Sequence, residues 1–175
     1  MVNSSFCLYL SVISSAVGYI DLWRQANSVI PPVTERMLCM GDEWYTFPSH
    51  FFVPSNVRLA YVKDSFTGQL PAYFASANGT SAHPPHPFNN VNAMEESRYV
   101  DLLSCDYIVA LMRRQGKEGP LESIVRAASS PFKPLAATLV LDPATSPALT
   151  RAFYVPWRSV QMNKYNDYVL FSRRS

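Results

Sequence analysis

The stretch from Met37 to Pro54, MLCMGDEWYTFPSHFFVP, contains the signals that decide the fold. It begins with a short apolar run, Met37 to Met40, which is typical of a buried β-strand, and Gly41 then marks a tight turn. Pro48 fits the first position of a short helix over residues 49–53, because its missing N–H would have no helical partner there anyway. The stretch therefore predicts a strand, a glycine turn and a helix, the first half of an α/β unit.

Further strands are predicted downstream of this unit. Val57 to Lys63 is rich in β-branched and aromatic residues, and a strand–helix–strand order normally forms a right-handed crossover with parallel strands. The clearest buried strand is Cys105 to Met112, an almost unbroken apolar run. Other strands are expected at residues 135–141, 152–155 and 165–173, and helical turns at 121–128 and 146–151. The predicted fold class is α/β: a small sandwich with a mixed sheet whose edges are antiparallel.

Composition and charge favour one domain close to a membrane. The chain has 175 residues, which suffices for a single domain. Charged residues make up 16% of the chain, below the ~25% usual in soluble domains. The net charge of +2 and the scattered Lys and Arg argue against a dedicated nucleic-acid surface, so no nucleic-acid partner is expected.

The first twenty residues form an apolar segment. Residues 2–20 carry no charged side chain, and a membrane span needs about 20 apolar residues, so this segment fits the end of a transmembrane helix. A secretory signal peptide and a buried helix of a soluble domain are the two alternatives, although no Lys or Arg precedes Arg24 as a signal peptide would require. We divide the chain into a membrane-helix end at 1–20, a connector at 21–36 and an α/β domain at 37–175.

No motif for metal, phosphate or nucleophilic chemistry is present in the sequence. There is no glycine-rich phosphate loop and no cysteine pair at metal-binding spacing. His83 and His86 lie in a proline-rich loop, where solvated histidines are the rule, and His50 stands beside two phenylalanines. No Ser-His-Asp arrangement can be assembled. We therefore expect no metal and no cofactor in this chain, and these patterns mark no catalytic nucleophile.

Acidic and aromatic residues follow the glycine turn: Asp42, Glu43, Trp44 and Tyr45. Such a group can bind a sugar, because aromatic faces stack on the C–H faces of a pyranose while carboxylates bind its hydroxyls. Neighbours in an extended segment point to opposite faces, so Asp42 and Glu43 do not form an acid–base pair. The competing interpretation is that the aromatic residues anchor the loop to the core.

The long irregular stretch at residues 64–92 contains a candidate modification site. It is rich in Gly and Pro, and loops of this length are commonly functional or mobile. Asn78-Gly79-Thr80 is an N-glycosylation acceptor sequence, which makes Asn78 a candidate glycosylation site if the domain faces the lumen. Chance occurrence of the acceptor sequence is the alternative.

Four segments occur in the order found in a known family. They are CMGDEWYTFPSHFFVP at 39–54, GQLP at 68–71, ESRYVD at 96–101 followed by Cys105, and RAFYVP at 151–156. Together they resemble the C-terminal, lumen-facing part of glycosyltransferase family twenty-two, in particular the endoplasmic-reticulum α-1,2-mannosyltransferases that use dolichyl-phosphate mannose. Four motifs in one order are specific, whereas one alone would be weak.

The resemblance implies a function for a larger protein. Enzymes of this kind move mannose from dolichyl-phosphate mannose to a dolichol-linked oligosaccharide, with inversion, and form an α-1,2 linkage during assembly of the N-glycan precursor. It implies an endoplasmic-reticulum membrane protein, a domain in the lumen, and a general base in a first lumenal loop that this chain lacks. The chain alone is thus expected to be inactive. A non-enzymatic secreted or membrane-tethered binding module, and a mannosyltransferase of another linkage, are the alternatives.

Residues of the matching segments are the candidates for substrate binding: Trp44, Tyr45, Arg98, Arg151 and Tyr154. Arg98 has acidic neighbours, so a structural ion pair is the competing interpretation there. Arg151 has fewer acidic neighbours, which leaves contact with a pyrophosphate or a partner more open. Tyr154 would otherwise be a core or membrane-interface residue.

Two of the three cysteines, Cys39 and Cys105, match cysteines of the family and fall in predicted core strands. In an oxidising lumen they would form a disulfide if their Cα atoms come within about 7 Å of each other. Two separate buried thiols are the alternative, because free cysteine is among the most buried residue types. The sequence leaves this choice open.

Overall fold

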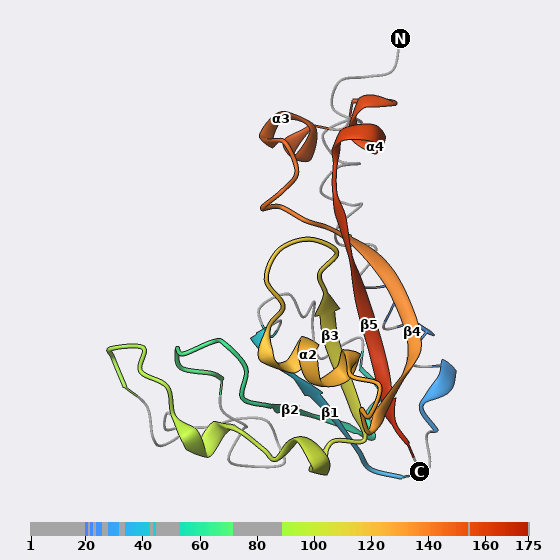
Figure 1. Cartoon of the computed structure of the whole chain (residues 1–175). Coiled ribbons are helices and arrows are strands. Elements are labelled where there is room, and N and C mark those ends of the chain that lie inside the picture. Colours follow the sequence, from blue (N-terminus) through green and yellow to red (C-terminus); the bar gives the residue numbers. More distant parts are fainter. Residues whose placement is uncertain are drawn as a thin grey trace.

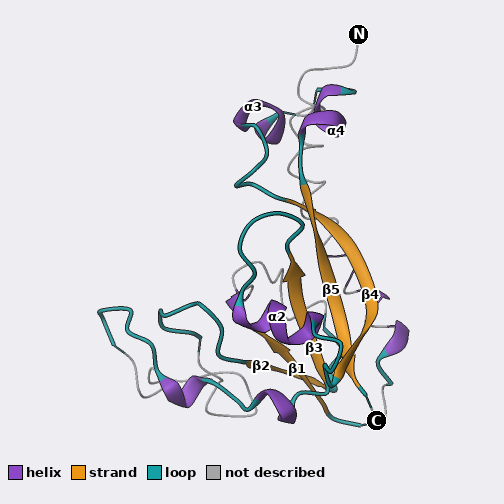
Figure 2. Ribbon diagram, viewed as in Figure 1, coloured by secondary structure: helices purple, strands orange, loops and turns teal. Residues whose placement is uncertain are grey.

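The structure, a computed structural model, describes residues 20, 22, 24–25, 28–31, 34–42, 44, 53–71, 89–153 and 155–174. At its centre is a five-stranded mixed sheet with the order β2-β1-β3-β5-β4 (Figures 1 and 2), which confirms the predicted α/β class. The strands are β1 (Arg36–Met40), β2 (Val57–Tyr61), β3 (Tyr107–Met112), β4 (Phe132–Leu141) and β5 (Tyr165–Arg173). The helices are η3 (Glu96–Arg98), η4 (Leu102–Ser104), α2 (Pro120–Arg126), α3 (Ala148–Ala152) and α4 (Arg158–Met162).

One half of the sheet is parallel, as the crossover pattern predicted. β1 pairs in parallel with β2, with Leu38 opposite Leu59, and on its other side with β3, with Cys39 opposite Ile108. The helix expected over residues 49–53 falls almost wholly outside the described part of the chain. β1 therefore has a neighbour on each side and is buried at its centre.

The other half of the sheet is antiparallel, because β5 pairs antiparallel with both β3 and β4. The expectation of two antiparallel edges was half wrong: β4 is an antiparallel edge, whereas the β2 edge is parallel, since β2 follows β1 by a crossover rather than a hairpin. β4 begins at Phe132, earlier than predicted, and includes Pro134, which lies at a break in register. Edge strands tolerate proline at such a break.

The short strand predicted at residues 152–155 is wrong. Ala152 ends α3, Val155 is exposed, and α4 follows where no helix was predicted. The backbone N–H of Val155 donates a 2.8 Å hydrogen bond to the hydroxyl oxygen of Ser159 instead of pairing with a strand. A side chain from the next helix thus satisfies the backbone that a sheet would otherwise pair.

The two faces of the sheet bury separate apolar clusters, because successive strand residues point to opposite faces. Leu38, Leu59 and Leu170 lie in one cluster, which is completed by Leu22 and Ile30 from the segment before β1. Cys39, Ile108 and Phe171 lie in the other, which α2 covers with Leu121 and Val125 (Figure 1).

Among the described residues, no helix is long and apolar enough to cross a membrane. The membrane-helix end predicted at residues 1–20 lies outside the described part of the chain, apart from Ile20 itself. Ile20, Leu22, Arg24 and other described residues up to Val29 are helical, and Leu22 is fully buried.

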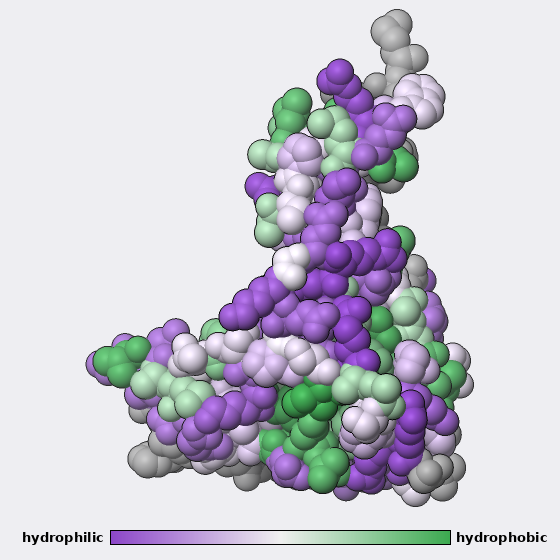
Figure 3. Space-filling model, in the orientation of Figure 1, coloured by the Kyte–Doolittle hydropathy of each residue, from purple (hydrophilic) through white to green (hydrophobic). Residues whose placement is uncertain are grey.

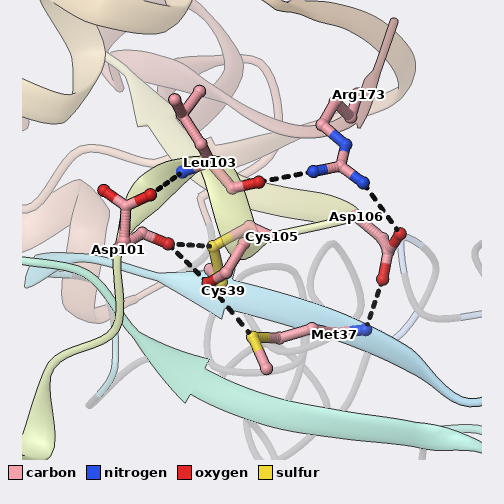
Figure 4. The surroundings of a disulfide bond; sticks show 8 residues. Met37, Cys39, Asp101, Leu103, Cys105, Asp106 and Arg173 are labelled. Carbon is pink, nitrogen blue, oxygen red and sulfur yellow. Dashed lines mark hydrogen bonds and ion pairs between the residues drawn. A yellow bond between two sulfur atoms is a disulfide. The ribbon is translucent and has the colours of Figure 1, made fainter. Parts of the chain in front are cut away.

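A disulfide joins Cys39 in β1 to Cys105 immediately before β3, with the Cα atoms 5.9 Å apart. Figure 4 shows that Asp106, next to this bond, accepts a 2.9 Å hydrogen bond from the N–H of Met37 and faces the guanidinium of Arg173 at 3.7 Å. Asp106 also pairs with Arg36 at 3.2 Å. The disulfide and the carboxylate of Asp106 therefore hold β1, β3 and β5 together at the end of the sheet where β1 and β3 begin.

Replacing both bonded cysteines, Cys39→Ala with Cys105→Ala, is expected to lower the free energy of unfolding by about 4 kcal/mol. The bond spans 66 residues, and opening a loop of that size restores entropy to the unfolded chain. Denaturant unfolding without reductant measures the change, with Cys7→Ala as the matched control that leaves the bond in place. Equal midpoints for the double variant and the wild type would contradict the role given to the bond.

Candidate functional site

The three parallel strands end at one edge of the sheet, and a charged side chain follows each of them: Asp42 after β1, Asp64 after β2 and Arg113 after β3. From β1 the chain forms β2 on one side and later β3 on the other, so the topological switch point lies between β1 and β3. Open α/β sheets bind ligands outside the carboxyl ends of their strands at such a point. This edge is therefore the first candidate for a ligand site.

The crevice at the switch point is filled by the chain itself. One carboxylate oxygen of Asp64 accepts a 3.1 Å hydrogen bond from the N–H of Leu121 at the start of α2, and the other accepts one of 3.4 Å from the N–H of Asp42. A Cβ on Gly41 would lie 2.6 Å from Asp64 Oδ2 and 2.9 Å from Leu121 Cδ2. The carboxylate of Asp64 thus occupies the position where related folds accept an anion.

Glu122 is the most deeply buried acidic group of this edge, with only 2% of its surface exposed. It accepts hydrogen bonds from the N–H of Arg113 at 2.6 Å, from the guanidinium of Arg113 at 3.2 Å and from that of Arg126 at 2.8 Å. A buried carboxylate with this many charged partners is a structural ion pair, because removing any partner would leave an uncompensated buried charge. Both of its oxygens accept hydrogen bonds from groups of the chain itself.

Beside the closed edge, Trp44, Phe66 and Tyr99 form a half-buried patch that we call the aromatic patch. The rings of Trp44 and Phe66 lie 5.5 Å apart between centroids, and all three side chains pack against the same core cluster. The hydroxyl of Tyr99 donates a 3.5 Å hydrogen bond to the carbonyl of Phe66, and Tyr99 forms a β-bridge with Tyr61 at the end of β2. Trp44 therefore anchors its loop to the core, as the competing interpretation proposed, and keeps part of its surface exposed.

Asp42 joins the aromatic patch to the closed edge. Its carboxylate accepts hydrogen bonds from the hydroxyl of Ser65 and, at 2.6 Å, from the N–H of Phe66. Burial raises the pKa of Asp42 above its ordinary value, and the nearby charge of Asp64 adds to this, whereas the N–H of Phe66 and the charge of Arg113 oppose it. Burial and the charge of Glu96 likewise raise the pKa of Tyr99, so its phenol stays protonated and keeps donating its hydrogen bond to the carbonyl of Phe66.

The described residues of this arrangement offer groups that can contact a ligand. The aromatic patch supplies ring faces and a phenol. Lys63, in the chain that follows β2, and Glu96 of η3 form an exposed ion pair with their charged atoms 2.7 Å apart. The carboxylates nearest to it hold the chain's own N–H and hydroxyl groups. No cluster of three or more potential metal ligands occurs among the described residues.

The structure brings some of the predicted site residues together and separates others. Arg98 lies in η3, directly before Tyr99, so it belongs near the aromatic patch with Trp44. Arg151 lies in α3, at the far end of the molecule (Figure 1), where its guanidinium donates a hydrogen bond to the carbonyl of Pro143. Arg98 and Arg151 therefore do not share one site. Several further candidates lie outside the described residues: Glu43, Tyr45, His50, Asn78, His83, His86 and Tyr154.

Sequence reasoning missed a basic hollow at the opposite edge of the sheet, next to the disulfide. Its volume is about 330 Å³, and its charged lining residues are Arg36, Asp106, Lys133, Arg173 and Arg174. Asp106 pairs with both Arg36 and Arg173, which leaves an excess of positive charge around the hollow. The four basic residues come from three different strands and the chain after β5, so no local sequence pattern could have grouped them.

Comparison with curated proteins finds relatives of one kind. The chain is 37% identical over 160 residues to the proteins of Mus musculus and Homo sapiens named alpha-1,2-mannosyltransferase ALG9, an alignment that covers 89% of this chain and 26% of either relative. The chain resembles ALG9 along most of its length. It is also 29% identical over 153 residues to the ALG9 of Saccharomyces cerevisiae, covering 78% of this chain and 27% of that protein.

The resemblance stated from the four motifs is thus confirmed by proteins from mammals and yeast. The chain spans about a quarter of the length of the curated ALG9 relatives that it matches. No family model matches the chain, and no solved structure matches it.

Gly41→Ala is expected to destabilise the fold by about 1–3 kcal/mol, because its Cβ would overlap Asp64 and Leu121 in a packed position. Gly119→Ala is the matched control: its Cβ would lie 3.4 Å from the same Asp64, an ordinary contact. Thermal unfolding of both variants measures the difference. A Gly41→Ala protein as stable as the Gly119→Ala protein would show that the switch-point crevice is open rather than filled.

Proposed function

We propose that this chain is the C-terminal, lumen-facing domain of an endoplasmic-reticulum membrane enzyme that transfers mannose from dolichyl-phosphate mannose to a dolichol-linked oligosaccharide. The bond formed is an α-1,2 linkage in the N-glycan precursor. The observation that carries the proposal is the 37% identity to alpha-1,2-mannosyltransferase ALG9 over 89% of this chain. No comparison favours the alternative of a non-enzymatic binding module.

Within that enzyme the domain acts as a scaffold and not as the source of reacting groups. Its acidic side chains at the closed edge, Asp42, Asp64 and Glu122, all accept hydrogen bonds from the domain's own backbone. The catalytic base is therefore supplied by other parts of the enzyme. The disulfide between Cys39 and Cys105 supports the lumenal placement, because such bonds persist in oxidising compartments.

The aromatic patch is where this domain contacts the oligosaccharide acceptor. Trp44 is half-buried, so one part of the ring packs on Phe66 while another part remains accessible to a sugar. Tyr45 follows it in the chain, and Arg98 precedes Tyr99, whose phenol oxygen can accept a hydrogen bond from a glycan hydroxyl. Arg151 lies in α3, on another surface, and is not part of this contact.

Transplanting the domain into a relative tests the main proposal. Residues 36–174 replace the matching segment of the Saccharomyces cerevisiae ALG9, and lipid-linked oligosaccharides are then analysed in cells that lack the native enzyme. The chimera is expected to extend the acceptor, whereas a control protein with the segment deleted, and this chain expressed alone, are not. A chimera that is present at normal levels but leaves the acceptor unextended would refute the proposal.

Substitution of Trp44 tests the acceptor contact in the same full-length enzyme. Trp44→Leu keeps an apolar side chain on Phe66 but removes the aromatic face, so we expect the KM for the acceptor to rise about fivefold, equivalent to about 1 kcal/mol. The KM for dolichyl-phosphate mannose should not change, and Trp44→Phe should restore most of the acceptor affinity. An unchanged acceptor KM in Trp44→Leu would show that Trp44 serves packing alone.

A further inference from the structure

The connection between β4 and β5, residues 142–164, projects from the body of the domain. β4 and β5 form a long two-stranded ribbon, and α3 and α4 lie at its end, away from the other three strands (Figures 1 and 2). We call residues 142–164 the ribbon tip. In the ribbon tip polar side chains are buried and apolar side chains are exposed, whereas the sheet buries apolar side chains.

Polar side chains occupy the interior of the ribbon tip. Thr150 and Ser159 are only 3% and 2% exposed, and Ser146 is also buried. The hydroxyl of Thr150 donates a 2.7 Å hydrogen bond to the side-chain oxygen of Asn163, whose amide nitrogen donates back to the carbonyl of Thr150 at 3.1 Å. The hydroxyl of Ser146 accepts a 2.8 Å hydrogen bond from the N–H of Lys164. The tip thus satisfies its own polar groups internally.

The apolar side chains of the ribbon tip lie on its outside, among polar ones. Trp157 is 80% exposed, Leu149 66% and Val160 64%. Phe153, Val155 and Met162 are exposed as well, and no described apolar side chain of the tip is buried. Figure 3 shows apolar surface among polar surface over α3 and α4 at the top of the view. Trp157 also has a positive φ of 62°, a conformation that L-residues rarely adopt, although its ring finds no burial in the domain.

Water alone does not favour this arrangement. An aqueous surface favours polar residues outside and apolar residues inside, whereas lipid favours backbone and polar groups that are satisfied within the segment and apolar groups that face outward. Tryptophan is enriched where a protein meets the membrane–water interface. The inverted burial of the ribbon tip therefore matches the surroundings of a bilayer surface.

The charge of the ribbon tip points to the same partner. Arg151, Arg158 and Lys164 are exposed, and no acidic residue occurs between Asp142 and Asp167. Anionic lipid headgroups attract such basic segments within a Debye length of the surface. Pairing of two tips from separate copies would instead bring like charges together without an exposed acidic partner, because Asp142 is buried.

We propose that the ribbon tip docks into the headgroup region of an anionic phospholipid bilayer. Leu149, Trp157 and Val160 reach toward the acyl chains, and Arg151, Arg158 and Lys164 lie among the lipid phosphates. The docking is independent of sugar transfer, because it rests on the burial and charge of the tip itself. It would fix the orientation of the sheet relative to the membrane surface.

Fluorescence quenching tests whether Trp157 touches lipid. The full chain is mixed with vesicles that contain phosphatidylserine and brominated phosphatidylcholine. The amount of tryptophan emission lost on mixing, at equal protein concentration, is compared between the wild type and Trp157→Phe. The apolar segment at residues 2–20 is present in both proteins, so its own contact with lipid cancels. The wild type should lose additional emission that Trp157→Phe lacks. Equal quenched emission in the two proteins would overturn the proposal.

Hydrogen exchange provides a second readout with a matched control. Backbone amides of residues 148–162 should exchange about tenfold more slowly when phosphatidylserine vesicles are added, because docking protects them. Replacing Leu149, Trp157 and Val160 together by Ser should abolish the slowing, while replacing the exposed Val91, Leu103 and Ile124 together by Ser should preserve it. Exchange without vesicles checks that both variants fold.

The outcomes against the proposal are specific. Unchanged exchange of the tip in the presence of vesicles would overturn it. Slowing that depends on protein concentration in the absence of lipid would also overturn it, and would instead identify the tip as a contact between copies of the chain.

Discussion

The disulfide between Cys39 and Cys105 holds the two central parallel strands in register, and the rest of the sheet is arranged around that pair. β1 pairs with β2 on one side and β3 on the other, while β3 carries the antiparallel ribbon through β5. Asp106 strengthens the same edge by accepting the N–H of Met37 and pairing with Arg36 and Arg173. The bond acts mainly by limiting the unfolded chain, so a domain of modest size keeps one topology.

The end of the sheet at which the parallel strands finish explains why this domain is suited to a supporting role. Asp64 occupies the switch-point crevice as an internal anion, held by the N–H groups of Leu121 and Asp42. A phosphate placed there would meet this carboxylate, which already accepts the N–H groups of Leu121 and Asp42. The accessible chemistry lies beside the crevice, in the aromatic patch, which offers ring faces and a phenol but no uncommitted carboxylate. Contact with a glycan fits this surface better than catalysis does.

The sheet and the ribbon tip follow opposite rules of burial. In the sheet, Leu38, Ile108 and Leu170 are fully buried, whereas in the tip the buried side chains include Thr150 and Ser159. Both regions belong to one short chain, so composition alone does not explain the difference. Different surroundings explain the difference. Water favours the burial of apolar side chains, whereas contact with lipid removes this preference.

The sequence by itself determined the local elements with strong patterns. The apolar run before Gly41, the run from Cys105 to Met112 and the alternating stretch at Tyr165 to Arg173 all became strands, since side-chain periodicity acts over a few neighbours. It failed at residues 152–155, where the hydroxyl of Ser159 and not a strand satisfies Val155. It also left the pairing of Cys39 with Cys105 undecided.

Only the tertiary structure decided which distant residues meet. Phe66 and Tyr99 join Trp44 from separate parts of the chain, and Asp64 reaches the start of α2 across 57 positions of sequence. The position of β2 at the edge of the sheet and the exposure of Trp157 likewise depend on the packing of the whole domain. Such contacts are set by the packing of the whole sheet, whose energy no short window of sequence contains.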